Sequence, residues 1–213
     1  MRRRTAVLLS GRGSNCAALI DAAADPAYPA EIALVLTNVP DAPGLARAAA
    51  AGVPTAAIDH RSFGRDRAAH ERAVIAALRA AGIELVCLAG YMRVLTPLLV
   101  GAYAGRMLNI HPSLLPAFPG LHTHAAALAA GVKLHGCTVH LVTEALDAGP
   151  IVAQAAVPVL PGDTEATLAA RVLVQELRLY PLALALLAGG GAGVPAAADA
   201  TLCNPLPGAG GVA

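Results

Sequence analysis

The chain has 213 residues, of which 56% are hydrophobic and only 3% aromatic, and its formal net charge is +1. This length suits a single α/β domain that buries its core without disulfides or metal ions. The scattered arginines and near-zero net charge predict small-molecule substrates and argue against a nucleic-acid partner.

Neither a membrane nor a metal partner is predicted. The longest uncharged stretch, residues 179–198, contains Pro181, Pro195 and three successive glycines, so we expect an apolar helix end and not a membrane-spanning helix. No secretory signal is visible at the N-terminus, and we expect a cytoplasmic protein. The cysteines lack the paired spacing of a metal or redox site; they are Cys16, Cys87, Cys137 and Cys203.

The first half of the chain alternates short β-like runs with alanine-rich helical patterns, which is typical of a parallel sheet covered by helices. The predicted strands are residues 5–9, 32–37, 55–58 and 85–88, and the predicted helices are residues 14–24, 44–51 and 66–81.

After residue 104 the pattern changes. Residues 107–111 are extended, residues 135–142 alternate and could pair with residues 151–157 as a hairpin, and residues 164–187 are helical. We therefore predict one Rossmann-like α/β domain over residues 1–188, with a mostly parallel twisted sheet, helices on both faces and a mixed C-terminal part. The Gly-, Ala- and Pro-rich residues 189–213 are predicted to form a disordered tail. The sequence leaves self-association into a homo-oligomer open.

A glycine-rich segment, Ser-Gly-Arg-Gly-Ser-Asn at residues 10–15, lies between the first predicted strand and the first predicted helix. Such a turn places backbone N–H groups at a helix N-terminus, which suits a phosphate. A plain turn capped by Ser14 or Asn15 is an equally good interpretation. A dinucleotide is disfavoured, because Cys16 replaces the third glycine and the second strand does not end in an acidic residue.

Residues 108–113, Leu-Asn-Ile-His-Pro-Ser, carry the most informative pattern. In an extended strand residues two apart share a face, so the side chains of Asn109 and His111 would project together. Pro112 ends the ladder and places the pair at the rim of the sheet. An amide beside a protonated imidazole would stabilise the oxyanion of an acyl transfer. A polar strand end with a satisfied histidine is the simpler alternative.

Asp147 follows the alternating residues 135–142 and lies in a turn before Gly149-Pro150. A carboxylate near His111 would favour the charged imidazolium, which could then serve as the oxyanion partner at neutral pH. From the local pattern alone, a turn-capping aspartate is the simpler interpretation.

Taken together, five ordered blocks resemble the folate-dependent formyltransferase family, most closely the members that act on glycinamide ribonucleotide. The blocks are residues 10–15, 88–93, 109–116, 119–124 and 136–149, and the resemblance covers residues 5–187. It implies transfer of the formyl group of 10-formyltetrahydrofolate, as co-substrate, to the amine of the ribonucleotide in purine biosynthesis, without a metal.

The resemblance also implies roles for individual residues. The catalytic residues would be Asn109, His111 and Asp147. The ribonucleotide would be bound by Gly13, Ser14 and Asn15, which hold its phosphate, and by Glu176. The folate would be bound by Arg67, Met92, Arg93, Val94, Leu95, Asn109, Thr143, Glu144, Ala145, Leu146 and Asp147.

One of these assignments has a competitor. The family has Arg-Glu-Ala-Phe-Asp at the start of the third helix, whereas this chain has Arg-Ala-Ala-His-Glu at residues 67–71, and Arg65 competes with Arg67. His122 and His124 match the family pattern, but we interpret them mainly as residues that structure a loop.

Other activities within the family are less compatible with the chain. Methionyl-tRNA formyltransferase normally has an added C-terminal oligonucleotide-binding domain, and formyltetrahydrofolate deformylase has an added N-terminal regulatory domain; neither is expected here. A sugar-nucleotide formyltransferase is harder to exclude, and only the loop at residues 13–15, which favours a ribonucleotide, argues against it. A catalytically silent phosphate-binding module is the alternative from a different class.

Overall fold

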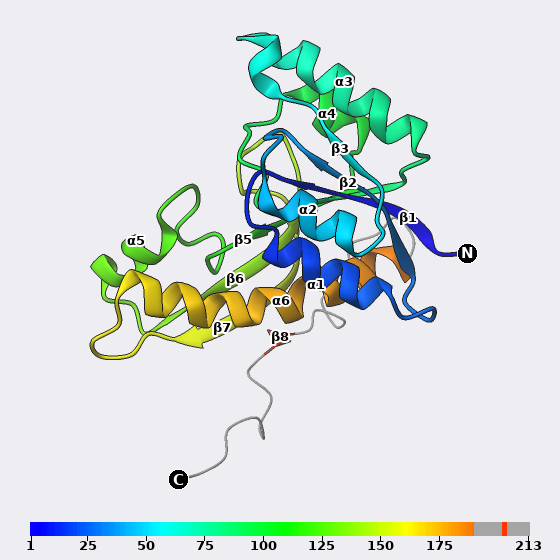
Figure 1. The fold of residues 1–213 in the computed structure, drawn as a ribbon. Helices are drawn as coiled ribbons and strands as arrows, with labels where there is room; N and C mark the ends of the chain where they lie inside the picture. The colour runs from blue at the N-terminus through cyan, green and yellow to red at the C-terminus, as the bar shows by residue number, and fades with distance from the viewer. Residues whose placement is uncertain (190–201, 204–213) are drawn as a thin grey trace.

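The computed structural model describes residues 1–189 and the backbone of residues 202–203 (Figure 1). Its strands are β1 (Arg3–Leu9), β2 (Ala30–Thr37), β3 (Thr55–Ala57), β4 (Leu85–Leu88), β5 (Met107–His111), β6 (Leu134–Leu141), β7 (Ile151–Pro158) and β8 (Leu202–Cys203). Its helices are α1 (Ser14–Ala23), α2 (Pro43–Ala50), α3 (Arg67–Ala80), α4 (Pro97–Ala102), α5 (Thr123–Ala130) and α6 (Glu165–Gly189), with a 3-10 turn, η1, at His60–Phe63. Apart from Gly189 and β8, the predicted disordered tail lies outside the described residues.

The strands form one sheet in the order β3-β2-β1-β4-β5-β6-β7-β8. The pairs from β3 to β5 are parallel, whereas β6 is antiparallel to both β5 and β7. The two-residue β8 lies parallel to β7. The predicted single α/β domain, with a mostly parallel sheet and a mixed C-terminal part, is confirmed.

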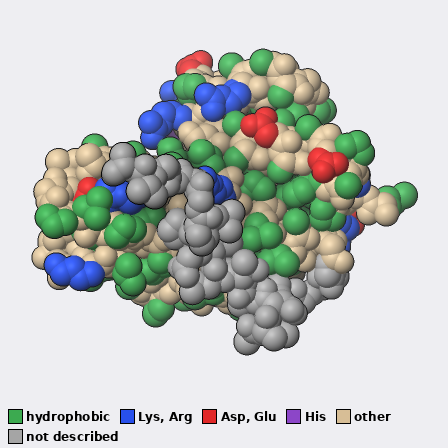
Figure 2. All heavy atoms as spheres, turned by 90° about the horizontal axis from the view of Figure 1, so that it is seen from below, with side chains coloured by type: hydrophobic (Ala, Val, Ile, Leu, Met, Phe, Trp, Pro, Cys, Tyr) green, Lys and Arg blue, Asp and Glu red, His purple; other side chains and the backbone are tan. Residues whose placement is uncertain are grey.

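Helices cover both faces of the sheet because successive side chains of each strand point to opposite sides. Val7 and Leu9 of β1 belong to a core formed with α1 and α6, whereas Ala6 and Leu8 belong to a second core formed with α3 and α4. On the face seen in Figure 2, acidic and basic side chains are few and are separated by hydrophobic and uncharged groups.

Helix α6 is the one helix among the described residues that is long and apolar enough to cross a membrane. Half of its most apolar window is buried inside the domain, and Leu168, Tyr180 and Leu184 are fully buried, which is the pattern of a core helix. Pro181 lies inside α6, and the helix continues beyond it to Gly189. The helix predicted over residues 164–187 likewise runs through this proline, and burial of the neighbouring Tyr180 and Leu184 offsets the cost of about 3 kcal/mol for a proline within a helix.

Candidate active site

The glycine loop, residues 10–15, connects the end of β1 to the start of α1. Gly13 is the N-cap of α1 with a φ of 74°, and no side chain caps the helix. The first N–H groups of a helix have no partner within it, so this end of α1 presents donors suited to an anion. The predicted turn geometry is confirmed, and the alternative in which Ser14 or Asn15 caps the helix is wrong.

Close contact with α2 fixes the shape of the glycine loop. A Cβ atom on Gly13 would lie 2.7 Å from the Cα atom of Gly44, and one on Gly44 would lie 2.8 Å from Leu9 Cδ2. The Gly44 N–H donates to the Gly11 carbonyl at 3.0 Å. Glycines are therefore required where two backbones approach, while Arg12 is exposed at the tip of the loop.

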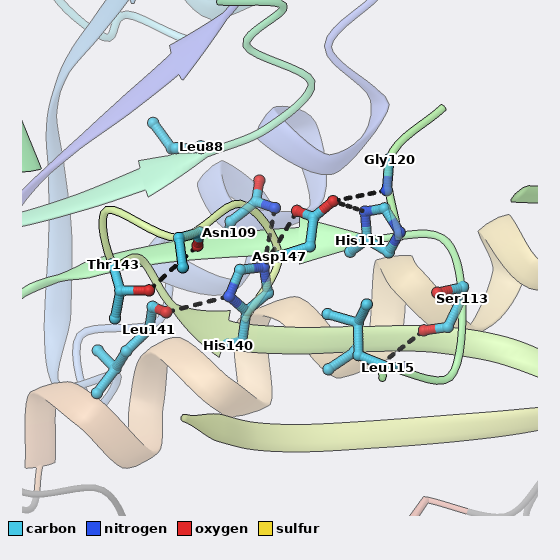
Figure 3. Close-up of polar contacts among 12 residues, drawn as sticks. Leu88, Asn109, His111, Ser113, Leu115, Gly120, His140, Leu141, Thr143 and Asp147 are labelled. Atoms are coloured by element: carbon cyan, nitrogen blue, oxygen red, sulfur yellow. Dashed lines mark hydrogen bonds and ion pairs between the residues drawn. The ribbon is translucent and has the colours of Figure 1, made fainter. Parts of the chain in front are cut away.

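Asn109 lies on β5 opposite His140 of β6 in the antiparallel register, so their side chains share one face of the sheet. Asn109 Nδ2 is 3.1 Å from His140 Nε2, and His140 Nδ1 is 3.0 Å from the Leu141 carbonyl (Figure 3). Since a carbonyl only accepts, His140 carries its hydrogen on Nδ1, and its Nε2 accepts from the amide of Asn109. Burial also lowers the pKa of His140, in keeping with a neutral ring.

His111 projects from the same face of β5, as predicted, and its side chain is 6% exposed. Its Nε2 donates to the Phe118 carbonyl at 3.0 Å. Its Nδ1 lies 3.5 Å from Asp147 Oδ2 (Figure 3). Nδ1 is therefore the ring nitrogen that faces the candidate site.

Asp147 comes from the loop between β6 and β7, which folds back so that its carboxylate lies between two histidines (Figure 3). One oxygen is 3.5 Å from His111 Nδ1 and accepts from the Gly120 N–H at 2.9 Å, and the other is 3.8 Å from His140 Nε2. Asp147 has a φ of 50°, a left-handed conformation that is uncommon outside glycine. The loop is thus held in a shape that brings this carboxylate to His111.

A buried network holds the segment that follows β5. Thr138 Oγ1 donates to the Ser113 carbonyl at 2.7 Å and accepts from the Leu115 N–H at 3.0 Å. The Gln154 amide donates to the Leu115 carbonyl at 2.8 Å. These bonds anchor the segment whose Phe118 carbonyl contacts His111.

Glu176 of α6 reaches the glycine loop. Asn15 Nδ2 donates to Glu176 Oε2 at 2.7 Å, whereas the buried Asn15 Oδ1 has no hydrogen-bond partner among the described residues. Burial raises the pKa of Glu176, with the Asn15 bond and nearby His111 acting in the opposite direction. The structure therefore brings together two residues predicted for the ribonucleotide, close to His111.

The residues predicted to bind folate lie mainly on two loops. Met92, Val94 and Leu146 are 70%, 62% and 66% exposed, which is unusual for large apolar side chains. Thr143, Glu144 and Ala145 are also exposed, while Arg93 and Leu95 are partly buried. Arg67, at the start of α3, and Arg65 are both exposed, so burial does not distinguish between them.

His124 and His135 form a second histidine pair behind the segment after β5. His124 Nδ1 is 3.1 Å from His135 Nε2, and the His135 ring packs edge-on against Phe118. His122, with a φ of 58°, is the N-cap of α5. These contacts fit the interpretation of His122 and His124 as loop-structuring residues.

Within residues 1–189, the cysteines offer no activated nucleophile near the site. Burial raises the pKa of Cys16 and of Cys87 to about 12, so both thiols stay protonated. Cys137 is buried in the sheet.

Sequence reasoning did not single out His140, although the register of a β5–β6 pair would have placed it opposite Asn109. The alternation of residues 135–142 was the available signal, because it puts every second residue of that strand on one face.

Comparison with known proteins identifies related chains. Residues 3–184 match the formyl transferase family. Phosphoribosylglycinamide formyltransferase of Escherichia coli (strain K12) is 47% identical over 184 residues, covering 86% of each chain. A crystal structure of phosphoribosylglycinamide formyltransferase from Brucella melitensis has a TM-score of 0.85 at 57% identity, covering 90% of this chain and 98% of that one.

A larger relative matches over only part of its length. The trifunctional purine biosynthetic protein adenosine-3 of Drosophila pseudoobscura pseudoobscura is 51% identical over 191 residues, which are 89% of this chain. The chain spans 14% of that relative's length.

Proposed function

The chain belongs to the formyl transferase family, and from this premise we propose that it transfers the formyl group of 10-formyltetrahydrofolate to the amine of 5-phosphoribosylglycinamide. The products are N-formylglycinamide ribonucleotide and tetrahydrofolate, in de novo purine biosynthesis. The observation that carries this proposal is the convergence of Asn109, His111 and Asp147 near the N-terminus of α1, whose uncapped N–H groups suit an anion. Relatives named for this reaction support the choice of acceptor.

In the proposed mechanism the neutral glycinamide amine attacks the formyl carbon directly, and the formyl oxygen becomes an oxyanion. One Nδ2 hydrogen of Asn109 is held by His140, so the second is free to donate to that oxygen. His111 already donates through Nε2 to Phe118, which leaves an Nδ1–H of the imidazolium as the second donor. No acyl-enzyme is formed.

Asp147 has two roles in this proposal. Its carboxylate, 3.5 Å from His111 Nδ1, favours the charged ring without holding Nδ1 in a short hydrogen bond. It also relays a proton through water from the attacking amine to N10 of the departing folate. The amine thus loses the proton that the leaving group gains.

The substrates are assigned to the two sides of this centre. The amides of Gly13, Ser14 and Asn15 hold the ribonucleotide phosphate. Glu176 accepts hydrogen bonds from the ribonucleotide. Because its carboxylate would repel the phosphate, these bonds come from other groups of the ribonucleotide. The exposed apolar side chains of Met92, Val94 and Leu146 pack on the folate. The neighbouring residues on the same two loops complete the folate site; they are Arg93, Leu95, Thr143, Glu144 and Ala145. Arg67 pairs with the anionic part of the folate.

The proposal includes a setting and partners. The enzyme acts in the cytoplasm on small-molecule substrates, with neither a metal, a nucleic acid nor a membrane taking part.

An absorbance assay for tetrahydrofolate, with glycinamide ribonucleotide as acceptor, tests this function. Loss of one oxyanion donor typically lowers the rate by about 10²–10³-fold, so Asn109→Ala and His111→Ala should each fall at least that far. Both variants should still bind the ribonucleotide, because the glycine loop is unchanged.

Three outcomes would contradict the proposal. Near wild-type turnover in both variants would remove the catalytic assignment. Ribonucleotide binding without turnover in the unchanged protein would indicate a silent binding module. Faster turnover with an amino-sugar nucleotide would reassign the acceptor.

A further inference from the structure

Ser10, the first residue of the glycine loop, forms side-chain hydrogen bonds with two other segments. Its hydroxyl accepts from the Met92 backbone N–H at 2.8 Å and donates to Asn38 Oδ1 at 2.6 Å. Its own backbone N–H donates to the Gly90 carbonyl at 3.0 Å. One residue therefore fixes the start of the loop against the segments that follow β4 and β2.

Asn38 is the buried partner of the Ser10 hydroxyl. It is 2% exposed, and His60 Nδ1 lies 2.9 Å from its carbonyl oxygen and 3.1 Å from its Nδ2. The Met92 backbone N–H can only donate, so the Ser10 oxygen is its acceptor. The single hydroxyl hydrogen of Ser10 is left to donate to Asn38 Oδ1.

The two segments that Ser10 joins belong to different substrates in the proposed function. Ser10 lies three residues before Gly13, the first residue assigned to the ribonucleotide phosphate, and Met92 begins the segment 92–95 assigned to folate. The Met92 and Val94 side chains are largely exposed, so packing alone fixes this segment weakly. A change at the loop would therefore reach Met92 through the 2.8 Å hydrogen bond.

We propose that Ser10 is a positioning residue that couples the two substrate sites: ribonucleotide bound at the glycine loop holds residues 92–95 in the arrangement that binds folate. This inference rests on the proposed function. Coupling of this kind is reciprocal, so each substrate raises the affinity for the other by the same factor.

The test is calorimetric titration of tetrahydrofolate with and without saturating glycinamide ribonucleotide, a pair that cannot react because no formyl group is present. In the unchanged protein the ribonucleotide should tighten tetrahydrofolate binding by about 5-fold or more, the lower end of typical coupling. The factor should fall to near one in Ser10→Ala and recover in Ser10→Thr, which keeps the hydroxyl.

Thr5→Val is the matched control. Thr5 lies on β1, which leads into the glycine loop, is fully buried and donates one hydrogen bond to the Arg3 carbonyl at 3.2 Å, so this variant also loses one hydroxyl. It should lower stability without changing the coupling factor. Ser10→Cys, which keeps the shape but hydrogen-bonds weakly, replaces Ser10→Ala if that variant does not fold.

The outcomes separate this inference from the proposed function. Unchanged coupling in Ser10→Ala, or an equal loss in Thr5→Val, would overturn the positioning role. Independent binding of both ligands to the unchanged protein would overturn the coupling and leave the proposed function intact. Failure of either ligand to bind would overturn the proposed function itself.

Discussion

The glycine loop and the centre around Asn109 lie at the ends of nearby strands but are built in different ways. The loop is six consecutive residues whose backbone forms the candidate anion site, with Gly13 in a left-handed conformation against Gly44. The centre is formed by side chains from β5, β6 and the loop that carries Asp147. A backbone site depends on the shape of one segment, whereas a side-chain site depends on how separate segments are held together.

The largest effect should come from Gly13→Ala, which tests whether backbone shape defines the loop. The added Cβ would meet Gly44 Cα at 2.7 Å, and alanine disfavours a φ of 74°. Left-handed strain of about 1–2 kcal/mol and overpacking of about 1–3 kcal/mol together predict a loss of about 2–5 kcal/mol in the free energy of unfolding. Urea denaturation measures this loss, and the KM for the ribonucleotide should rise.

Gly11→Ala is the control within the same loop. A Cβ on Gly11 would meet no atom within 4 Å, and its φ is not in the left-handed range. Its stability should change by less than about 0.5 kcal/mol. Equal losses in the two variants would show that the close approach to Gly44 does not define the loop.

The same difference explains what could be predicted from the sequence. The main strands and the helices α1, α2, α3 and α6 follow periodic hydrophobic patterns and lie within a few residues of their predicted bounds. Two short helices were not predicted. Helix α4 has six residues and depends on Glu71, which accepts hydrogen bonds from the Thr96 and Leu99 N–H groups. Such a contact across 25 or more residues has no local pattern.

The candidate site divides in the same way. The glycine loop and the shared face of Asn109 and His111 could be predicted from spacing alone. The approach of Asp147 to His111 depends on a loop that folds back after β6, and only the family resemblance implied it. The contact of His140 with Asn109 depends on the register between two strands, which spacing within one strand does not fix.

Acid should destabilise the segments around the Asn109 centre before it destabilises the glycine loop. Burial lowers the pKa of His135 to about 4, so its ring is neutral in the folded protein, whereas in the unfolded chain it protonates near 6.5. The neutral ring therefore contributes its full share to the free energy of unfolding above about pH 6.5. This share, at most about 3 kcal/mol, is lost as the pH falls toward 4. Hydrogen exchange at pH 7 and pH 5 should show the loss in residues 112–124 before the glycine loop.

His135→Gln isolates this contribution, since glutamine does not titrate. Its free energy of unfolding should depend less on pH between 6.5 and 4 than that of the unchanged protein. The lowered pKa of His124, also caused by burial, acts in the same direction and should leave a smaller residual slope. An identical pH profile in the variant would contradict the assignment to His135.

The smallest of these effects should come from His140→Ala, which leaves all three proposed catalytic residues in place. Asn109 would lose the acceptor that orients its amide, and a misplacement of about 1 Å can cost about 10²-fold, so kcat should fall by about that factor while the KM for the ribonucleotide changes little. His124→Ala removes a partly buried histidine whose ring contacts His135 and does not orient Asn109, and it should retain a much larger share of kcat. If the two variants lost kcat equally, general loosening of the sheet would explain the effect, and the orientation of Asn109 by a side chain on the next strand would be refuted.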